Sequence, residues 1–167
     1  MMEMKLLSKS DSLLWKSIRL EALLSYPENY LSSFEEESLR SDQQWEDVIV
    51  QNKIYGLFID EQLVSTVSLS PKSAFKHRHK GEIWGVYTKP MFQGKGFAYL
   101  LLAYVLEQAQ TSLDLCYLTC TTSNKSAYRI YQKLGFETYG IELKSIYVNK
   151  HYYDEYLMAI DFSNKNP

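Results

Sequence analysis

Residues 82–98 constrain the fold of this chain more than any other part of it. A strand-like run ends just before Pro90, and two glycines then stand two residues apart at Gly94 and Gly96. A long apolar stretch begins at Phe97. This order predicts a strand, a glycine-rich turn and the N-terminus of a helix. Free N–H groups in such a turn, together with the helix dipole, favour a bound phosphate or pyrophosphate.

The glycines alone leave a plain tight turn and an anion site equally open. They do not form the dinucleotide-binding fingerprint, because Ala98-Tyr99 stands where a third glycine is needed. They do not form a P-loop, because no Gly-Lys-Ser/Thr follows four variable residues. A generic phosphate-binding α/β module is therefore one interpretation of this stretch.

A second stretch, residues 124–136, narrows the interpretation. Together the two stretches resemble the GNAT N-acetyltransferase superfamily. The acetyl-CoA loop of that family reads Gln/Arg-x-x-Gly-x-Gly/Ala, which residues 93–98 match. Its next motif is matched at every position, by Asn124, Ala127, Tyr131, Gly135 and Phe136. The resemblance extends over residues 54–162, including a last strand near residues 151–158, whereas residues 1–53 share only a loose helix layout.

The order of hairpin and strand–helix–strand units predicts an α/β fold, and the resemblance implies a single-domain GNAT-like architecture. We expect a mixed central sheet of about six to seven strands flanked by about four helices. The domain should cover residues 1–163, and residues 164–167 should fray. Expected strands are 3–7, 54–59, 63–69, 82–88, 115–121, 136–139 and 153–161; expected helices are 11–26, 41–50, 94–110 and 124–134. Residues 28–38 are expected to form a polar connector.

Composition excludes several classes. Of 167 residues, 46% are hydrophobic and 23% charged, with a net charge of −2, so the chain gives no overall case for nucleic-acid binding. The basic run at residues 76–80 is predicted to be a solvated loop more readily than an anion contact. The N-terminus lacks an apolar signal core, and the longest apolar run, 97–106, is too short to span a membrane.

The two cysteines predict no cross-link and no metal site. Cys116 and Cys120 stand four apart in a strand-like segment, roughly 13 Å from each other, and cannot form a disulfide. They also lack the spacing and the nearby histidine of a zinc site. Two thiols without a disulfide framework favour a reducing, cytoplasmic location.

The resemblance implies that acetyl-CoA is the acyl donor. Its pyrophosphate would accept from backbone N–H groups of the loop, and the pantetheine amides would pair with a splayed strand just before it, where Gly85 could relax a bulge. Asn124 and Tyr131 would also contact the donor, although Asn124 is equally well explained as a helix N-cap. The donor-binding candidates are Val86, Tyr87, Thr88, Gln93, Gly94, Lys95, Gly96, Phe97, Ala98, Asn124 and Tyr131.

Two residues are candidates for proton transfer. Tyr131 is the candidate general acid, because a phenol can protonate a departing thiolate within hydrogen-bond reach; without the motif it would be a core tyrosine. Glu82 is the candidate general base, since a protonated amine cannot attack a thioester; a surface glutamate is the equal alternative. Asp154 and Glu155 lie in a stretch that frequently edges the acceptor pocket in such proteins, and His151 reads as a surface residue more than a base.

The predicted function is transfer of an acetyl group from acetyl-CoA to a primary amine of an unidentified small molecule or peptide, by direct attack and without a metal. The alternative is a non-catalytic acyl-CoA-binding sensor of the same fold. The acceptor should contact residues 20–40, 71–80 and 140–155, with a homodimer left open. Acidic residues there suit a cationic amine, although a solvated acidic surface is the default: Glu28, Glu35, Glu36, Glu37, Asp154 and Glu155.

Overall fold

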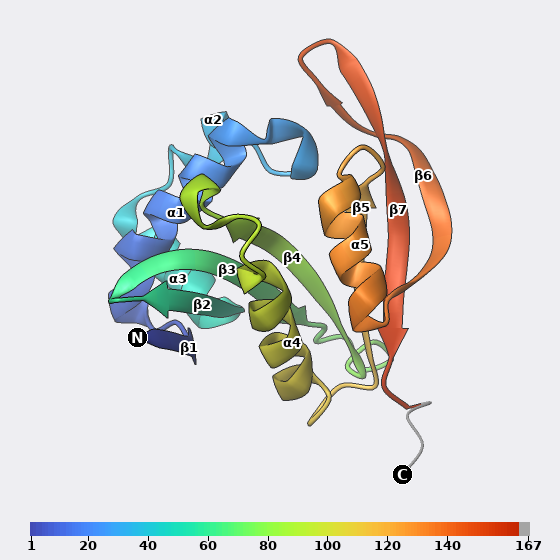
Figure 1. Ribbon diagram of the computed structural model, residues 1–167, viewed down its shortest axis with the longest axis horizontal. Helices are drawn as coiled ribbons and strands as arrows, with labels where there is room; N and C mark the ends of the chain where they lie inside the picture. The colour runs from blue at the N-terminus through green and yellow to red at the C-terminus, as the bar shows by residue number, and fades with distance from the viewer. Residues whose placement is uncertain (164–167) are drawn as a thin grey trace.

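The computed structural model describes residues 1–163, which form one seven-stranded sheet with helices on both faces (Figure 1). The strands lie in the order β1-β2-β3-β4-β5-β7-β6. Their bounds are β1 Met2–Leu6, β2 Lys53–Ile59, β3 Gln62–Pro71, β4 Lys80–Thr88, β5 Leu115–Thr121, β6 Glu137–Val148 and β7 His151–Asp161. β4 and β5 pair in parallel within an otherwise antiparallel sheet, so the predicted mixed α/β architecture is confirmed.

The helices are α1 Ser12–Ser25, α2 Phe34–Glu37, α3 Asp42–Gln51, α4 Phe97–Ala109 and α5 Lys125–Leu134. Ser41 caps α3 by accepting the N–H of Gln44, while the Gln44 side chain accepts the N–H of Ser41 in return. No helix within residues 1–163 is long and apolar enough to cross a bilayer. The tail at 164–167, for which fraying was predicted, lies outside the described residues.

Two buried clusters hold the helices to opposite faces of the sheet. On one face, Leu101 and Val105 of α4 and Tyr131 of α5 belong to a cluster with apolar side chains of β2 to β5 and β7. On the other face, α1 and α3 pack through Trp15 and Trp45, whose rings meet edge to face at 5.2 Å. Helices therefore cover both faces of the sheet, and the opening in the sheet lies between two strands, β4 and β5, toward their C-terminal ends.

The sheet splays open between β4 and β5. Their pairing is confined to Lys80–Glu82 of β4 against Leu115–Tyr117 of β5. Beyond Glu82, β4 bulges against β3, because Ser68 pairs with Trp84 whereas Thr66 pairs with Tyr87. Gly85 lies in this bulge with a φ of +62°, a conformation that L side chains rarely adopt. The splay and the glycine-relaxed bulge that the resemblance implied are both present.

Three boundaries differ from the sequence-based expectation. Helix α4 begins at Phe97 rather than at Gly94, because both loop glycines have positive φ. Residues 28–38 are more than a connector: Ser33 accepts the N–H of Glu36 and starts α2. Strand β6 continues to Val148, well beyond the expected residue 139, because it pairs with β7 in a long hairpin.

Candidate active site

Two clefts open from the splay and meet. The first, which we call the glycine-loop cleft, has a volume of about 530 Å³ and lies between the end of β4, the loop before α4 and the start of α5. The second, the hairpin cleft, measures about 600 Å³ and extends toward α2 and the β6–β7 hairpin. Six residues line both: Asn29, Tyr30, Val86, Asn124, Ala127 and Tyr131.

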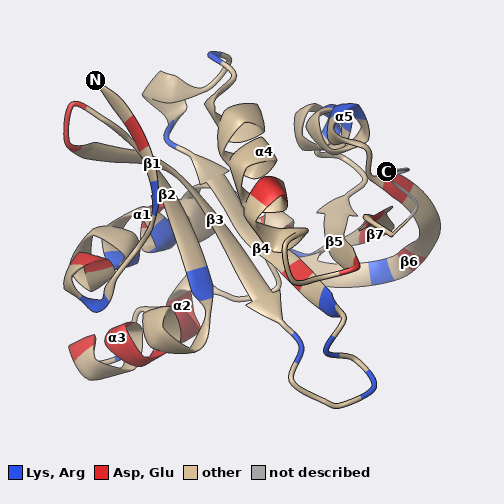
Figure 2. Cartoon of the chain, turned by 90° about the horizontal axis from the view of Figure 1, so that it is seen from below, with Lys and Arg blue, Asp and Glu red and all other residues tan. Residues whose placement is uncertain are grey.

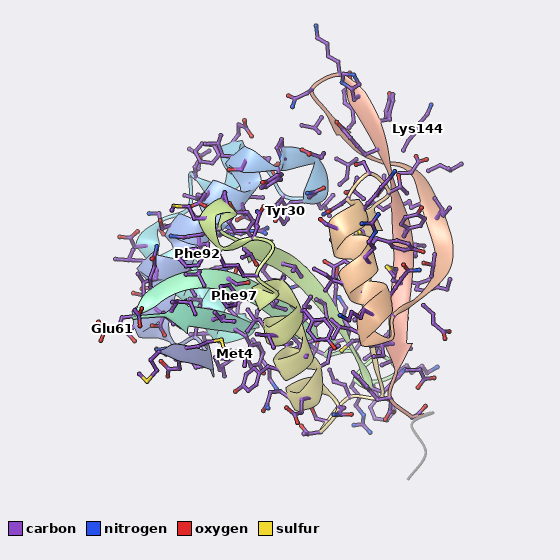
Figure 3. All side chains as sticks on the ribbon, viewed as in Figure 1. Met4, Tyr30, Glu61, Phe92, Phe97 and Lys144 are labelled. Carbon is purple, nitrogen blue, oxygen red and sulfur yellow. The ribbon has the colours of Figure 1, made fainter. Side chains whose placement is uncertain are left out.

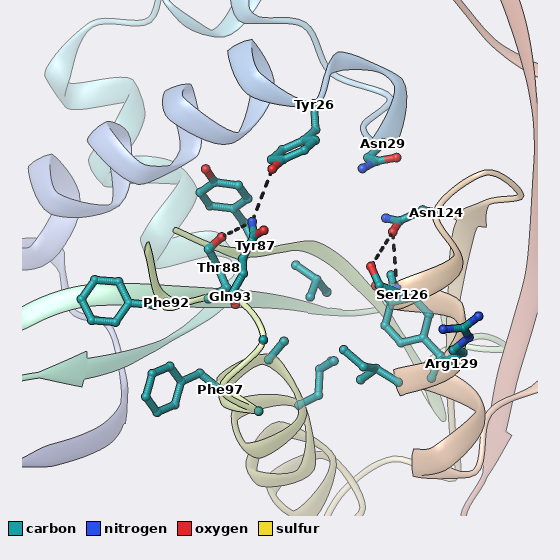
Figure 4. A pocket seen from close by; sticks show the side chains of 18 of the residues that line it. Tyr26, Asn29, Tyr87, Thr88, Phe92, Gln93, Phe97, Asn124, Ser126 and Arg129 are labelled. Atoms are coloured by element: carbon teal, nitrogen blue, oxygen red, sulfur yellow. Dashed lines mark hydrogen bonds between the residues drawn. The ribbon is translucent and has the colours of Figure 1, made fainter. Parts of the chain in front are cut away.

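The loop before α4 presents bare backbone to the glycine-loop cleft (Figure 4). Gly94 and Gly96 have φ values of +73° and +82°, and a Cβ added at either position would meet nothing within 4 Å. Gly96 is the N-cap of α4, so the first N–H groups of that helix lack intrahelical partners. The loop therefore offers open space beside free donors at the positive end of a helix dipole, which suits a pyrophosphate.

Gln93 lines the glycine-loop cleft and is already hydrogen-bonded. Its backbone N–H already donates to the carbonyl of Pro90, so the free donors of the loop begin after it. Its side-chain Nε2 donates to the carbonyl of Thr88 at 2.9 Å (Figure 4). Gln93 thus ties the loop to the end of β4. Lys95 is exposed, with its ammonium over the Phe92 ring at 5.4 Å.

Side chains hold the end of β4 in place beyond the bulge. The Val86 carbonyl accepts from the Tyr30 hydroxyl at 3.0 Å, and the Tyr87 carbonyl accepts from Ser65 at 2.9 Å. The Tyr87 hydroxyl, in turn, donates to Glu21. These three hydrogen bonds tie the end of β4 to neighbouring elements.

Tyr131 lies where the two clefts meet. It projects from α5, is only 6% exposed and lines both clefts. Burial raises the pKa of its phenol well above the ordinary value, and nearby Cys120 and Tyr30 raise it further. The hydroxyl is therefore protonated over the whole neutral range, as a proton donor must be.

Asn124 serves as the N-cap of α5. Its Oδ1 accepts the N–H of Ala127 at 3.4 Å, and the hydroxyl of Ser126 lies at the same distance. The amide nitrogen takes no part in these bonds, and the side chain lines the cleft (Figure 4). The capping and the donor-contacting interpretations of Asn124 are therefore compatible.

A segment that the sequence predicted only as a polar connector on the acceptor side links the two sides of the splay. In residues 26–33, the Tyr30 hydroxyl bonds to β4, while the carbonyl of Glu28 accepts from Thr121 of β5 at 2.8 Å. Tyr30 thereby reaches into the opening between the N-terminal helices and α5 (Figure 3). The signal in the sequence was two tyrosines, Tyr26 and Tyr30, inside an otherwise polar stretch.

Glu82 lines the hairpin cleft, but it is engaged. Its carboxylate accepts from Lys72 at 2.9 Å, and its side chain is 40% exposed. Hydrogen bonds from Lys72 to Tyr117 and to Glu82 raise the pKa of the lysine. Glu82 lies where β4 and β5 are still paired, at the narrow end of the splay.

Of the six acidic residues expected around the acceptor, Glu37 and Glu155 line the hairpin cleft. Glu37 is buried and forms two bonds to Arg19, at 3.0 and 3.1 Å, and Arg40 approaches it at 3.4 Å. Glu155 is buried in the wall of the hairpin cleft. The others expected at the acceptor line neither cleft: Glu28, Glu35, Glu36 and Asp154.

Other candidate groups lie away from the clefts. His151 is exposed at the start of β7, and no residue of 71–80 lines either cleft. Basic residues are spread along that loop (Figure 2), and its residues 73–79 are exposed, as predicted for a solvated loop. Within residues 1–163, no group of three or more His, Cys, Asp or Glu side chains is placed to hold a metal ion.

Comparison with known proteins decides the family. The model of the acetyltransferase (GNAT) family matches residues 15–136, which contain the loop, the bulge and both motifs. The chain belongs to the GNAT family. It is thus an acetyltransferase.

Similar proteins agree with this assignment. The chain is 25% identical over 138 residues to a spermidine N(1)-acetyltransferase from Vibrio cholerae, covering 79% of this chain and 80% of the relative. It is 26% identical over 124 residues to the L-amino acid N-acetyltransferase AaaT of Escherichia coli, covering 71% and 76%. Among solved structures, yncA from Salmonella typhimurium with its cofactor acetyl-CoA superposes with a TM-score of 0.83 at 17% identity, covering 100% and 97%. A GNAT acetyltransferase from Streptococcus pneumoniae gives 0.84 at 20% identity, covering 96% and 99%.

Proposed function

We propose that this GNAT enzyme binds acetyl-CoA in the glycine-loop cleft, binds a small primary amine in the hairpin cleft, and transfers the acetyl group directly where the clefts meet. The observation that carries the proposal is the shared lining of the two clefts at Val86, Asn124 and Tyr131. Two substrates that approach from opposite sides can react there without a covalent enzyme intermediate.

The donor half of the proposal is supported by the backbone. Free N–H groups after Gly94 suit the pyrophosphate, and the bulged end of β4, Val86 to Thr88, suits the pantetheine amides. Tyr131 is proposed to protonate the thiolate, and Asn124 to contact the donor with its free amide nitrogen. Among the residues expected from the sequence, Gln93 has a supporting role in this account, because it positions the loop rather than lending its N–H.

The acceptor half is supported by the relatives. Proteins named for spermidine and for L-amino acids point to a small amine as acceptor. Glu82 stays a candidate base, acting through water, although its ion pair with Lys72 must then open. Neither cysteine is proposed as a nucleophile, because burial raises the pKa of both thiols to about 12.

Initial-rate kinetics test this function. Spermidine, L-amino acids, aminoglycosides and short peptides are offered with acetyl-CoA, and free thiol is measured. We expect thiol release with at least one amine, and intersecting double-reciprocal lines that indicate a ternary complex. Parallel lines would contradict direct transfer. Acetyl-CoA binding without thiol release by any amine would favour a sensor domain instead.

A further inference from the structure

Glu155 of β7 is a buried carboxylate without a counter-charge. It is 7% exposed and accepts a hydrogen bond from Ser145 at 2.5 Å, but it forms no ion pair within the described residues. The cations that line the hairpin cleft, Arg19 and Arg40, both contact Glu37 instead. A buried charge is costly unless it is paired, so this carboxylate is suited to receive a cation from the cleft.

The strand register places Glu155 at the level of the bulge. Glu82 pairs with Tyr117 of β5, whereas Glu155 pairs with Thr121, four residues further along the same strand. Four residues of strand span about 13 Å. Parallel strands advance together, so the bulge at Val86 is nearer in level to Thr121 than to Tyr117. Glu82 therefore lies at the narrow end of the splay, whereas Glu155 lies in the wall of the hairpin cleft at about the level of the bulge.

The electrostatic neighbours of Glu155 agree with this position. Burial chiefly, and the Glu155 carboxylate in addition, raise the pKa of the Cys120 thiol to about 12. Cys120 in turn contributes to the raised pKa of Tyr131. Cys120, Glu155 and Tyr131 all line the hairpin cleft, so both proton-transfer groups have Cys120 as a neighbour.

The remaining ionisable groups of the hairpin cleft do not supply a cation to Glu155. The lining contains the neutral or acidic groups Cys120 of β5, Tyr131 of α5, Tyr30 and Glu142, the strand partner of Glu155 on β6. It also contains the Arg19–Glu37–Arg40 group and the Lys72-bound Glu82. The positive groups in this set are already engaged with carboxylates.

We propose that Glu155 binds the ammonium group of the acceptor and takes its proton, a role that rests on the proposed function. One proton passes from the ammonium to the Glu155 carboxylate. The nitrogen lone pair then forms the C–N bond to the acetyl carbon as the C–S bond breaks, and Tyr131 protonates the sulfur. A second proton from the nitrogen restores the Tyr131 phenol, and Glu155 releases its proton to water, so amide, CoA thiol and one free proton result.

Glu155→Gln is the variant that tests this role, since the amide keeps the size of the side chain and an oxygen that can accept from Ser145. With the best amine of the panel, we expect thiol release to fall by about 10²–10⁴-fold and the acid limb of the pH profile to disappear. Glu155→Asp should restore part of the rate. Asp154→Asn is the matched control. Asp154 precedes Glu155 in β7, lines neither cleft and accepts a hydrogen bond from the backbone N–H of Lys144.

Thermal melts of the same variants separate catalysis from folding. A carboxylate kept for binding predicts that Glu155→Gln melts at or above the wild-type temperature. Turnover within about twofold of wild type, or a melting temperature lowered by more than about 5 °C, would overturn the proposal and make Glu155 structural.

A wild-type protein that releases no thiol with any amine would contradict the proposed function but leave this inference testable. Spermidine should then raise the melting temperature of the wild type more than that of Glu155→Gln. Equal shifts in the two proteins would overturn the role of Glu155.

Discussion

The glycine-loop cleft and the hairpin cleft open from the same splay, yet different kinds of residues line them. The wall of the first combines aromatic and apolar side chains, among them Phe92, Phe97 and Ile130, with bare backbone at two positive-φ glycines. Charged and polar side chains from α1, α2, β4, β5 and the β6–β7 hairpin form a larger part of the wall of the second. In the proposed function, the first cleft receives acetyl-CoA and the second receives the amine.

The proposed function assigns a different kind of recognition to each cleft. Backbone N–H groups at a glycine turn and a helix start can bind a pyrophosphate without help from particular side chains. An ammonium group is instead proposed to be recognised by the Glu155 carboxylate, which is not part of the donor cleft. Variants that affect one cleft and spare the other therefore test the comparison.

Substitution in the glycine loop should have the largest effect. Gly96→Val places a β-branched side chain at a φ of +82°, in space that nothing in the protein fills. We expect it to abolish measurable acetyl-CoA binding in calorimetry while the protein stays folded. Gly140→Ala, in β6, is the control, since its Cβ would make ordinary contact at 3.4 Å with Leu157. Unchanged affinity in a folded Gly96→Val protein would remove the loop from the donor site.

Substitution of Tyr131, where the two clefts meet, should lower turnover and leave acetyl-CoA binding unchanged. Tyr131→Phe removes one hydroxyl and keeps the ring, which packs edge to face against Phe136 at 5.9 Å. We expect turnover to fall by up to about 10²–10⁴-fold, less if the CoA thiolate leaves readily, with little change in acetyl-CoA affinity. Turnover within about twofold of wild type would make Tyr131 a packing residue.

Substitution in the wall of the hairpin cleft should act on stability. Arg19→Ala leaves the buried Glu37 without its two-bond partner, which typically costs about 3–5 kcal/mol of unfolding free energy. Lys9→Ala is the control, because the exposed Lys9–Glu46 pair should contribute less than about 1 kcal/mol. Urea denaturation measures both, and equal losses would contradict the difference between buried and exposed pairs.

Each unit of alkaline pH should produce the smallest of these effects. The thiols of Cys116 and Cys120 have pKa values raised by burial from 9.0 to about 12, so the folded chain keeps protons that the unfolded chain loses. Their contribution to stability is present below pH 9 and is lost as pH rises toward about 12, with a slope of at most about 1.4 kcal/mol per pH unit for each thiol. Denaturation curves at several pH values check this. Cys116→Ala should flatten the slope, and an unchanged slope would contradict the assignment.

The two clefts also differ in how much of each could be predicted from the sequence. The strand–loop–helix order and the bulge near Gly85 are local features, and both were anticipated, as was the N-cap at Asn124. The hairpin cleft was not, because it unites residues far apart in the chain. Tyr30 meets Val86 across 56 positions, and Glu37 is neutralised by Arg19, which no local pattern reveals. The length of β6 also escaped prediction, since pairing with β7 rather than hydrophobic alternation extends it.

A crystal structure with acetyl-CoA bound would test most directly the claim that transfer occurs where the two clefts meet. We expect the pyrophosphate on the backbone after Gly94, and the thioester sulfur within about 3–3.5 Å of the Tyr131 hydroxyl, with the acetyl group facing the hairpin cleft. An acetyl group directed away from Tyr131, or a donor bound outside the glycine-loop cleft, would contradict the account.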